Sequence, residues 1–210
     1  MVCHMSDLSL SEDERPGRGG RPRDPSRDGA IRAAILQVLA ESGYAGLTMD
    51  AVASAAGVGK ATIYRRWRTK SDLVADAVAQ LSQMSIAAPD TGSIEGDLRV
   101  LLRWLVQAVN GPLGAATLSV LSALPHEPGL RAAFHNGPLD VWTSTFRQVW
   151  EQAEARGEVP QSLVGTAVAY TASAPILQRW LFSGQRVDDA FADEVLSDVV
   201  LPLLSARYAA

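Results

Sequence analysis

The sequence contains little cysteine and no long uninterrupted apolar run. Cys3 is the single cysteine, so an intrachain disulfide and a cysteine-based zinc cluster are excluded. The most apolar stretch, Leu163 to Leu177, is interrupted by hydroxyl side chains and by Pro175, which argues against a membrane-spanning helix. The first residues lack the apolar core of a secretory signal. We therefore expect a cytoplasmic protein with no membrane partner, no metal and no cofactor.

Acidic and basic residues are distributed unevenly along the chain, whose net charge is −4. Between Arg15 and Lys70 there are 11 Arg and Lys against 4 Asp and Glu, a net charge of +7. Residues 71–210 carry 8 against 15, a net charge of −7. A basic part in front of an acidic body favours binding of a polyanion through one face. The hydrolase and zinc-peptidase motifs GxSxG and HExxH are missing, and no enzyme is predicted.

The segment from Thr48 to Lys70, TMDAVASAAGVGKATIYRRWRTK, predicts two short helices joined by a tight turn. Thr48 is the expected N-cap of the first helix, and Asp50 is well placed against its positive end. Gly57 is expected to end this helix, and Gly59 to open the second. This layout is typical of a helix-turn-helix that inserts its second helix into DNA. The outward face of the second helix is predicted to carry Lys60, Thr62, Tyr64, Arg65 and Arg66.

These residue types suit a reader of the major groove. Arginine and lysine donate to guanine and to phosphate oxygens, threonine offers a methyl group and a hydroxyl, and tyrosine offers a hydroxyl on a flat body. Lys70 follows one short loop later, where its ammonium is expected to reach backbone phosphate. The alternative is a solvated basic helix on an ordinary helical bundle.

Residues 31–78 resemble the TetR family of bacterial one-component transcription regulators. The resemblance is carried by Gly43-Tyr44, by GLTMDAVASAAGVGKATIYRRW and by the following RTKSDLV. It implies that Thr48 caps its helix and contacts phosphate, and that Lys70 binds phosphate. Arg66 departs from the pattern, because many members carry histidine there. The residues expected to contact DNA are Thr48, Gly59, Lys60, Ala61, Thr62, Tyr64, Arg65, Arg66 and Lys70.

Residues 1–23 are rich in glycine, proline, serine and charge, and are predicted to form a disordered basic arm. Arg18, Arg21 and Arg23 lie on a glycine-proline backbone that can enter a narrow minor groove. A solvated tail without a DNA contact is the alternative.

No strand pattern or internal repeat appears, and the predicted fold is all-α with about nine helices. A three-helix helix-turn-helix domain is expected over residues 24–70. A helical bundle that binds an effector and forms the dimer is expected over 71–210. Apolar periodicity and breaks predict helices at about 71–86, 94–110, 113–124, 139–156, 161–183 and 188–207.

The resemblance implies that the helices at about 161–183 and 188–207 pair with their copies in a homodimer. Their apolar composition independently calls for cover on two sides. A homodimer would read a palindromic operator, since two recognition helices are then related by a two-fold axis.

The resemblance also implies a cavity for a small effector behind the reader. We expect an apolar or aromatic effector, and the alternative is a plain core in which these side chains only pack. The predicted function is a transcriptional repressor released by this effector. A regulator without a small-molecule effector, constitutive or controlled by a protein, and a transcriptional activator remain the alternatives. The expected pocket residues are Trp104, Gln107, His126, Phe134, His135, Trp142, Phe146 and Tyr170.

Overall fold

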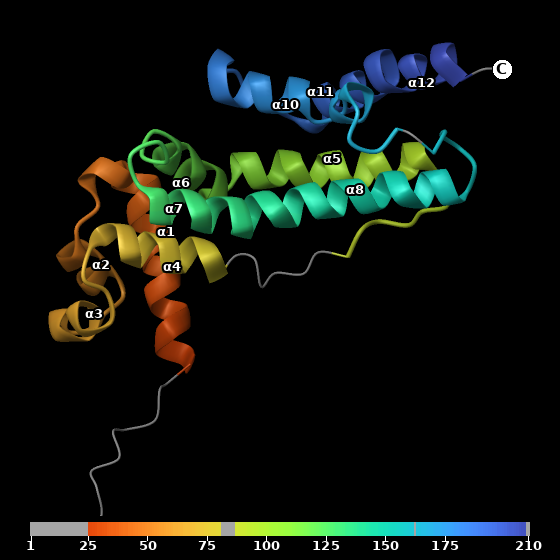
Figure 1. Ribbon diagram of the computed structural model, residues 1–210. Coiled ribbons are helices and arrows are strands. Elements are labelled where there is room, and N and C mark those ends of the chain that lie inside the picture. The colour runs from red at the N-terminus through yellow and green to blue at the C-terminus, as the bar shows by residue number, and fades with distance from the viewer. Residues whose placement is uncertain (1–24, 81–86, 162, 209–210) are drawn as a thin grey trace, which may run out of the picture.

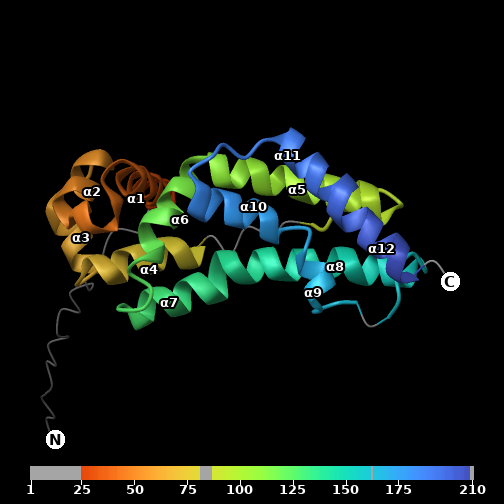
Figure 2. The ribbon, with the colours of Figure 1, turned by 90° about the horizontal axis from the view of Figure 1, so that it is seen from above.

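Every regular element in residues 25–80, 87–161 and 163–208, the part that the computed structural model describes, is a helix. These residues form ten continuous helical stretches, so the all-α prediction is confirmed. The N-terminal helices gather at one end of a long body built on two antiparallel helices, α5 and α8 (Figures 1 and 2). Within the described residues, no helix combines the length and the apolar character needed to cross a bilayer.

Four helices form the N-terminal unit: α1 (Pro25–Gly46), α2 (Met49–Ala55), α3 (Lys60–Arg66) and α4 (Lys70–Gln80). The buried side of α1 carries Ile31, Ile35 and Leu39, and its helical conformation is interrupted at Gly43, where φ is 66°. The continuation of α4 that the sequence predicts, and the N-terminal arm, lie outside the described residues.

The core of this unit is not closed by its first three helices alone. The same buried cluster includes Leu73 and Val74 from α4 and Ala116 from α6 (Pro112–Leu121). It also includes Leu130 from α7 (Pro128–Phe134). Helices α1 and α4 both pack against helices of the body, α6 and α7. The domain boundary predicted at Lys70 would therefore cut through one buried cluster, and it stays a prediction.

The two long helices of the body are α5 (Ile94–Asn110) and α8 (Asp140–Ala155), which confirms the helices expected at 94–110 and 139–156. Between them, the chain turns at Gly111 into α6, and Gly114 in the first turn of α6 lies against the end of α5. A Cβ there would lie 2.1 Å from the carbonyl oxygen of Val109, so only glycine fits. From α7 the chain passes through a π-helical segment, η2 (His135–Leu139), directly into α8. Within this helical stretch Gly137 is non-helical, with φ −113° and ψ −112°.

A third group of short helices lies across α5 and α8 (Figure 1). It consists of α9 (Ala167–Tyr170), α10 (Ala174–Gln178), η3 (Arg179–Ser183), α11 (Asp189–Glu194), η4 (Val195–Val200) and α12 (Leu201–Tyr208). The last three are continuous and begin at the N-cap Asp188, whose carboxylate accepts from the amide N–H of Phe191, as the prediction of a helix at 188–207 requires.

The helix expected at 161–183 is wrong at its start. Residues 163–166 are not helical: Gly165 has a φ of 79°, and the carboxylate of Glu154 accepts from the amide N–H groups of Leu163 and Val164, at 3.3 and 3.4 Å. Helix α9 begins only after Thr166, whose hydroxyl caps it. Pro175 stands in the first turn of α10, where its fixed φ suits the start of a helix.

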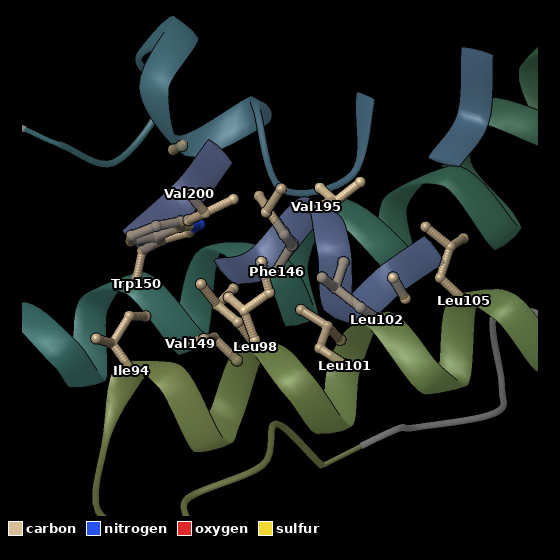
Figure 3. Close-up of a cluster of buried hydrophobic side chains, with 14 of the residues drawn as sticks. Ile94, Leu98, Leu101, Leu102, Leu105, Phe146, Val149, Trp150, Val195 and Val200 are labelled. Atoms are coloured by element: carbon tan, nitrogen blue, oxygen red, sulfur yellow. The ribbon is translucent and has the colours of Figure 1, made fainter. Parts of the chain in front are cut away.

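Apolar side chains from α5, α8 and the α11–η4 stretch meet in the core of the body (Figure 3). Trp150 is fully buried there with Leu98, Leu101 and Val200. Its indole N–H has no hydrogen-bond partner among the described residues, which is uncommon for a buried donor.

The buried carboxylate of Asp97 joins the first turn of α5 to Arg156, the C-cap residue of α8. Asp97 is 0% exposed, and one of its oxygens accepts from the amide N–H and the hydroxyl of Thr91, at 2.6 and 2.8 Å. Its other oxygen accepts from the guanidinium of Arg156 at 2.7 Å. Arg156 also pairs with Asp90 and Glu158. Burial alone would raise the pKa of Asp97, but the Thr91 and Arg156 donors outweigh it and hold that pKa below the ordinary value of 3.8.

We expect Asp97→Asn to lower the free energy of unfolding at pH 7 by about 2 kcal/mol, because it removes a charge-assisted pair and leaves Thr91 with poorer acceptors. Since the folded pKa is depressed, this contribution is present above the ordinary aspartate pKa and is lost as pH falls through the folded pKa. Urea unfolding at several pH values between 7 and 3 should therefore show the two proteins converging in acid. Asp90→Asn is the control, since Asp90 is exposed. A constant difference down to pH 3 would mean that the ionised carboxylate is not responsible.

Candidate nucleic-acid interface

The turn between α2 and α3 has the geometry that the sequence predicts. The hydroxyl of Thr48 accepts from the amide N–H of Ala51 at 3.1 Å, which confirms Thr48 as the N-cap of α2. Gly57, one residue beyond the last helical cap, has a φ of 62°, a conformation that side chains other than glycine rarely adopt. Gly59 is the N-cap of α3. The two helices are therefore held at a fixed angle by a short glycine turn.

Helix α3 has one buried side and one solvent side. Ile63 is 0% exposed and packs with Val52 and Ala53 of α2, so the axis of α3 is fixed against the unit. On the solvent side, Lys60, Ala61, Tyr64 and Arg65 are exposed, and Thr62 is half-buried. Helices α2 and α3 lie at the end of the molecule away from α12 (Figures 1 and 2). A convex helix with this side exposed can enter a groove about 12 Å wide.

Asp50 joins two of the exposed side chains. The ammonium of Lys60 lies 2.5 Å from its carboxylate, and the hydroxyl of Tyr64 donates to it at 3.3 Å. The hydrogen bond from Lys60 lowers the pKa of Asp50, and the same bond raises the pKa of Lys60. Both groups are therefore charged at neutral pH, and the positive charge of Lys60 is compensated within the protein.

Two further predicted DNA contacts are already engaged with the protein. The guanidinium of Arg66 pairs with Asp28 of α1 at 2.6 Å and lies over the ring of Trp67, 5.3 Å from its centroid. The ammonium of Lys70 donates to the backbone carbonyls of Tyr44 and Ala45 at 3.0 and 3.3 Å. Lys70 thus satisfies carbonyl groups at the end of α1 that have no helical partner. In this structure Arg66 and Lys70 fasten α3 and α4 to α1.

The structure therefore gathers part of the expected set on one surface. We define the reading surface as the exposed residues of α3, Lys60, Ala61, Tyr64 and Arg65, with the adjoining Thr62, Asp50 and Thr48. Arg18, Arg21 and Arg23 lie outside the described residues. The sequence interpretation assigned Asp50 only to the helix end and missed its contacts with the exposed side chains of α3. The sequence feature that could have revealed these contacts is an acidic residue two positions after the N-cap of α2, in a helix that precedes the basic helix α3.

Only three of the eight residues expected to line an effector pocket share one cluster in the structure. Trp142 stacks on Phe146 with ring centroids 5.9 Å apart, and Phe146 meets Trp150 edge-on at 6.1 Å. Trp104 packs against the same core cluster. Four of the others lie apart from this cluster: Gln107, His126 and His135 are exposed, and Tyr170 is 53% exposed.

The eighth member, Phe134, belongs to the N-terminal cluster. It lines a small apolar pocket between α1, α4, α6 and α7, with Leu36, Val78 and Leu113 among the other lining residues. This pocket lies where the N-terminal unit joins the body, and Trp104, Trp142 and Phe146 do not line it. The expected set is therefore divided between two clusters and the solvent surface.

Two family models match successive parts of the chain. Residues 31–77 match the family model of bacterial regulatory proteins of the tetR family. Residues 88–199 match the model of the tetracyclin repressor-like C-terminal domain. The first match covers the helix-turn-helix and most of α4, and the second covers most of the body.

Whole-chain relatives agree with the domain matches. A DNA-binding transcriptional repressor TetR of Mycobacteroides abscessus is 30% identical over 183 residues, 87% of this chain and 96% of the relative. An uncharacterized HTH-type transcriptional regulator of Mycobacterium tuberculosis is 29% identical over 189 residues, which are 88% of this chain and 93% of the relative. The crystal structure of a TetR-family regulator from Mesorhizobium loti has the same fold, with a TM-score of 0.68 and a sequence identity of 19%. The superposition covers 89% of this chain and 98% of the chain from Mesorhizobium loti. The chain belongs to the TetR family of DNA-binding transcriptional regulators.

Proposed function

We propose that the protein is a homodimeric, cytoplasmic repressor that binds a palindromic operator through α3 and is released by a small apolar or aromatic effector. The observation that carries the DNA-binding part is the geometry of α3. Its buried side, at Ile63, is anchored in the N-terminal core, while Lys60, Tyr64 and Arg65 are exposed on the other side. A rigidly mounted helix with donors on its free side is what direct readout of base edges requires.

The repressor role is supported by the relative from Mycobacteroides abscessus, which is named a repressor and aligns over nearly its whole length. The homodimer is supported by apolar side chains left exposed in the C-terminal helices, such as Phe182 at 80% and Leu203 at 39%. We further propose that Arg18, Arg21 and Arg23 contact the minor groove beside the operator, as basic arms do.

Selection of bound duplexes from a random pool by the full chain tests this function. We expect enrichment of a palindrome whose half-sites are centred about 34–36 Å apart, one turn of the duplex, or a multiple of that distance. A single half-site would contradict the dimer, and no enrichment at low salt would contradict sequence-specific binding. The position of the palindrome relative to promoters then separates a repressor from an activator.

We place the proposed effector against the aromatic cluster of Trp104, Trp142 and Phe146. Trp104 and Trp142 are only half-buried, so a ligand has access to the edge of this cluster. An apolar compound that saturably changes tryptophan fluorescence should then also release the selected duplex.

A regulator without a small-molecule effector is the second candidate. It is favoured by the close packing of Phe146 and Trp150, which are 5% and 0% exposed in the core of the body. If no apolar compound alters binding of the selected duplex, the result favours a constitutive or protein-controlled regulator.

A further inference from the structure

Asp50 places a negative charge in the middle of a surface otherwise suited to a polyanion. Its carboxylate holds the ammonium of Lys60 at 2.5 Å and the hydroxyl of Tyr64 at 3.3 Å. Asp50 also lies two residues after Thr48, the expected phosphate contact at the start of α2. Two of the side chains expected to read DNA are thus bound to one acidic residue of the neighbouring helix.

The fold has little need of this pair. The side chains of Lys60 and Asp50 are 67% and 46% exposed, and ion pairs at such exposure contribute little to stability. The N-terminus of α2 is already capped by Thr48, and α3 is held by the buried Ile63. A carboxylate beside a duplex, by contrast, is repelled by the phosphates and takes a cation away from them. The consequence of Asp50 is therefore expected in DNA binding rather than in folding.

We propose that Asp50 is a specificity-determining residue, which weakens binding to arbitrary DNA by holding Lys60 and Tyr64 and is compensated only on the preferred sequence. To contact DNA, Lys60 exchanges the carboxylate for a guanine or phosphate oxygen. Asp50 then needs a new donor, and the amino group of a cytosine in the groove is one that a carboxylate accepts from. A sequence without such a donor leaves the carboxylate facing DNA unpaired. This inference rests on the proposed use of α3 as the recognition helix.

The test compares Asp50→Asn with the unchanged full chain on two duplexes of equal length, one selected by the unchanged chain and one of scrambled sequence. We expect the variant to bind the scrambled duplex about fivefold more tightly, with a salt slope steeper by about one unit, because Lys60 is free to neutralise a phosphate. On the selected duplex the loss of the contact made by Asp50 offsets this gain. The ratio of the two affinities should therefore fall by about fivefold or more.

Two matched variants sharpen the test. Glu41→Gln removes the same charge from an exposed position of α1, where its carboxylate contacts only Gln37 among the interactions described, and it should leave the affinity ratio unchanged. In a Lys60→Met background, Asp50→Asn should no longer steepen the salt slope, because no captured cation remains to be released. Thermal unfolding of each variant checks that the fold is kept.

The outcomes separate this inference from the proposed function. If the unchanged chain prefers no duplex, sequence-specific binding fails and the role of Asp50 fails with it. If it prefers one duplex and Asp50→Asn leaves the ratio unchanged, or strengthens both duplexes equally, the role of Asp50 is overturned while the proposed function stands.

Discussion

Replacing Lys60 and Arg65 together by glutamine is expected to lower the affinity for the selected duplex by about 100-fold, since each arginine or lysine contact to a base or phosphate contributes about 1–3 kcal/mol. Both side chains are exposed on α3, so the change should leave the fold intact. The slope of log affinity against log salt should become shallower by up to about two units. Fluorescence anisotropy at several salt concentrations measures both quantities.

The control removes two positive charges from the body. Arg103 and Arg147 are exposed on α5 and α8, and their joint replacement by glutamine changes the net charge equally. Affinity should fall by less than about threefold in this control, because screening at physiological salt limits the effect of distant charges. Equal losses in the two double variants would show that binding follows net charge and not α3. Lys70 is left unchanged, since its ammonium holds the end of α1.

The helix-turn-helix was predictable because its signals are local. An N-cap acts on an amide three residues away, and a left-handed glycine acts on its own backbone, so Thr48 and Gly57 determine the geometry of the turn from within the segment. The buried position of Ile63 follows from helical period in the same way. These signals keep their meaning whatever the rest of the chain does.

Contacts between helices could not be predicted from such signals. Whether Lys60 and Lys70 are free or engaged depends on which carboxylate or carbonyl the packing of α1, α2 and α4 brings within reach. In each case a basic residue of the motif meets an acceptor from another element. Sequence period assigns a face to a residue but not its partner. For this reason the interpretation assigned the exposed side of α3 correctly and missed the contacts that Asp50 makes with it.

The C-terminal half was predicted less well, because apolar composition gave no reliable boundary. The residues before α9 are rich in apolar side chains, yet Gly165 has a φ of 79° and Thr166 is extended, so the helix starts only at Ala167. The aromatic residues illustrate the same difficulty. Trp142 and Phe146 are four positions apart on α8 and stack, as helical spacing allows. Phe134 packs in the N-terminal cluster and Tyr170 is exposed, and neither position could be predicted from spacing along the sequence.

The packing between the two parts of the chain links the reading surface to the body. Helix α1 lies against α6, and α4 lies against α7, so any movement of the body against its partner subunit would be passed to α3 through two contacts. A regulator built in this way can alter the spacing of two recognition helices only if the subunits are held together. The dimer is therefore as important to the proposed function as α3 itself.

We expect Phe182→Asp and Leu203→Asp each to weaken dimerisation and to lower affinity for the palindromic duplex by about 100-fold, because a single subunit binds one half-site without the gain from linkage. Phe182 and Leu203 are 80% and 39% exposed within one chain, on η3 and α12 of the group of short helices that lies over α5 and α8 (Figure 1). A charge at these positions costs the folded subunit little, but in a dimer it would be buried without a partner. Light scattering should change from twice the chain mass of 22.4 kDa toward that mass.

Leu118→Asp provides the matched control, because Leu118 is also 39% exposed but lies on α6, outside the helices proposed to pair. It should leave both the mass in solution and duplex affinity nearly unchanged. If Leu118→Asp instead dissociates the dimer while Phe182→Asp and Leu203→Asp do not, the interface lies over α6. The partner subunit would then sit close to the contact between α1 and α6, and its position would act on the recognition helix directly rather than through the whole length of the body.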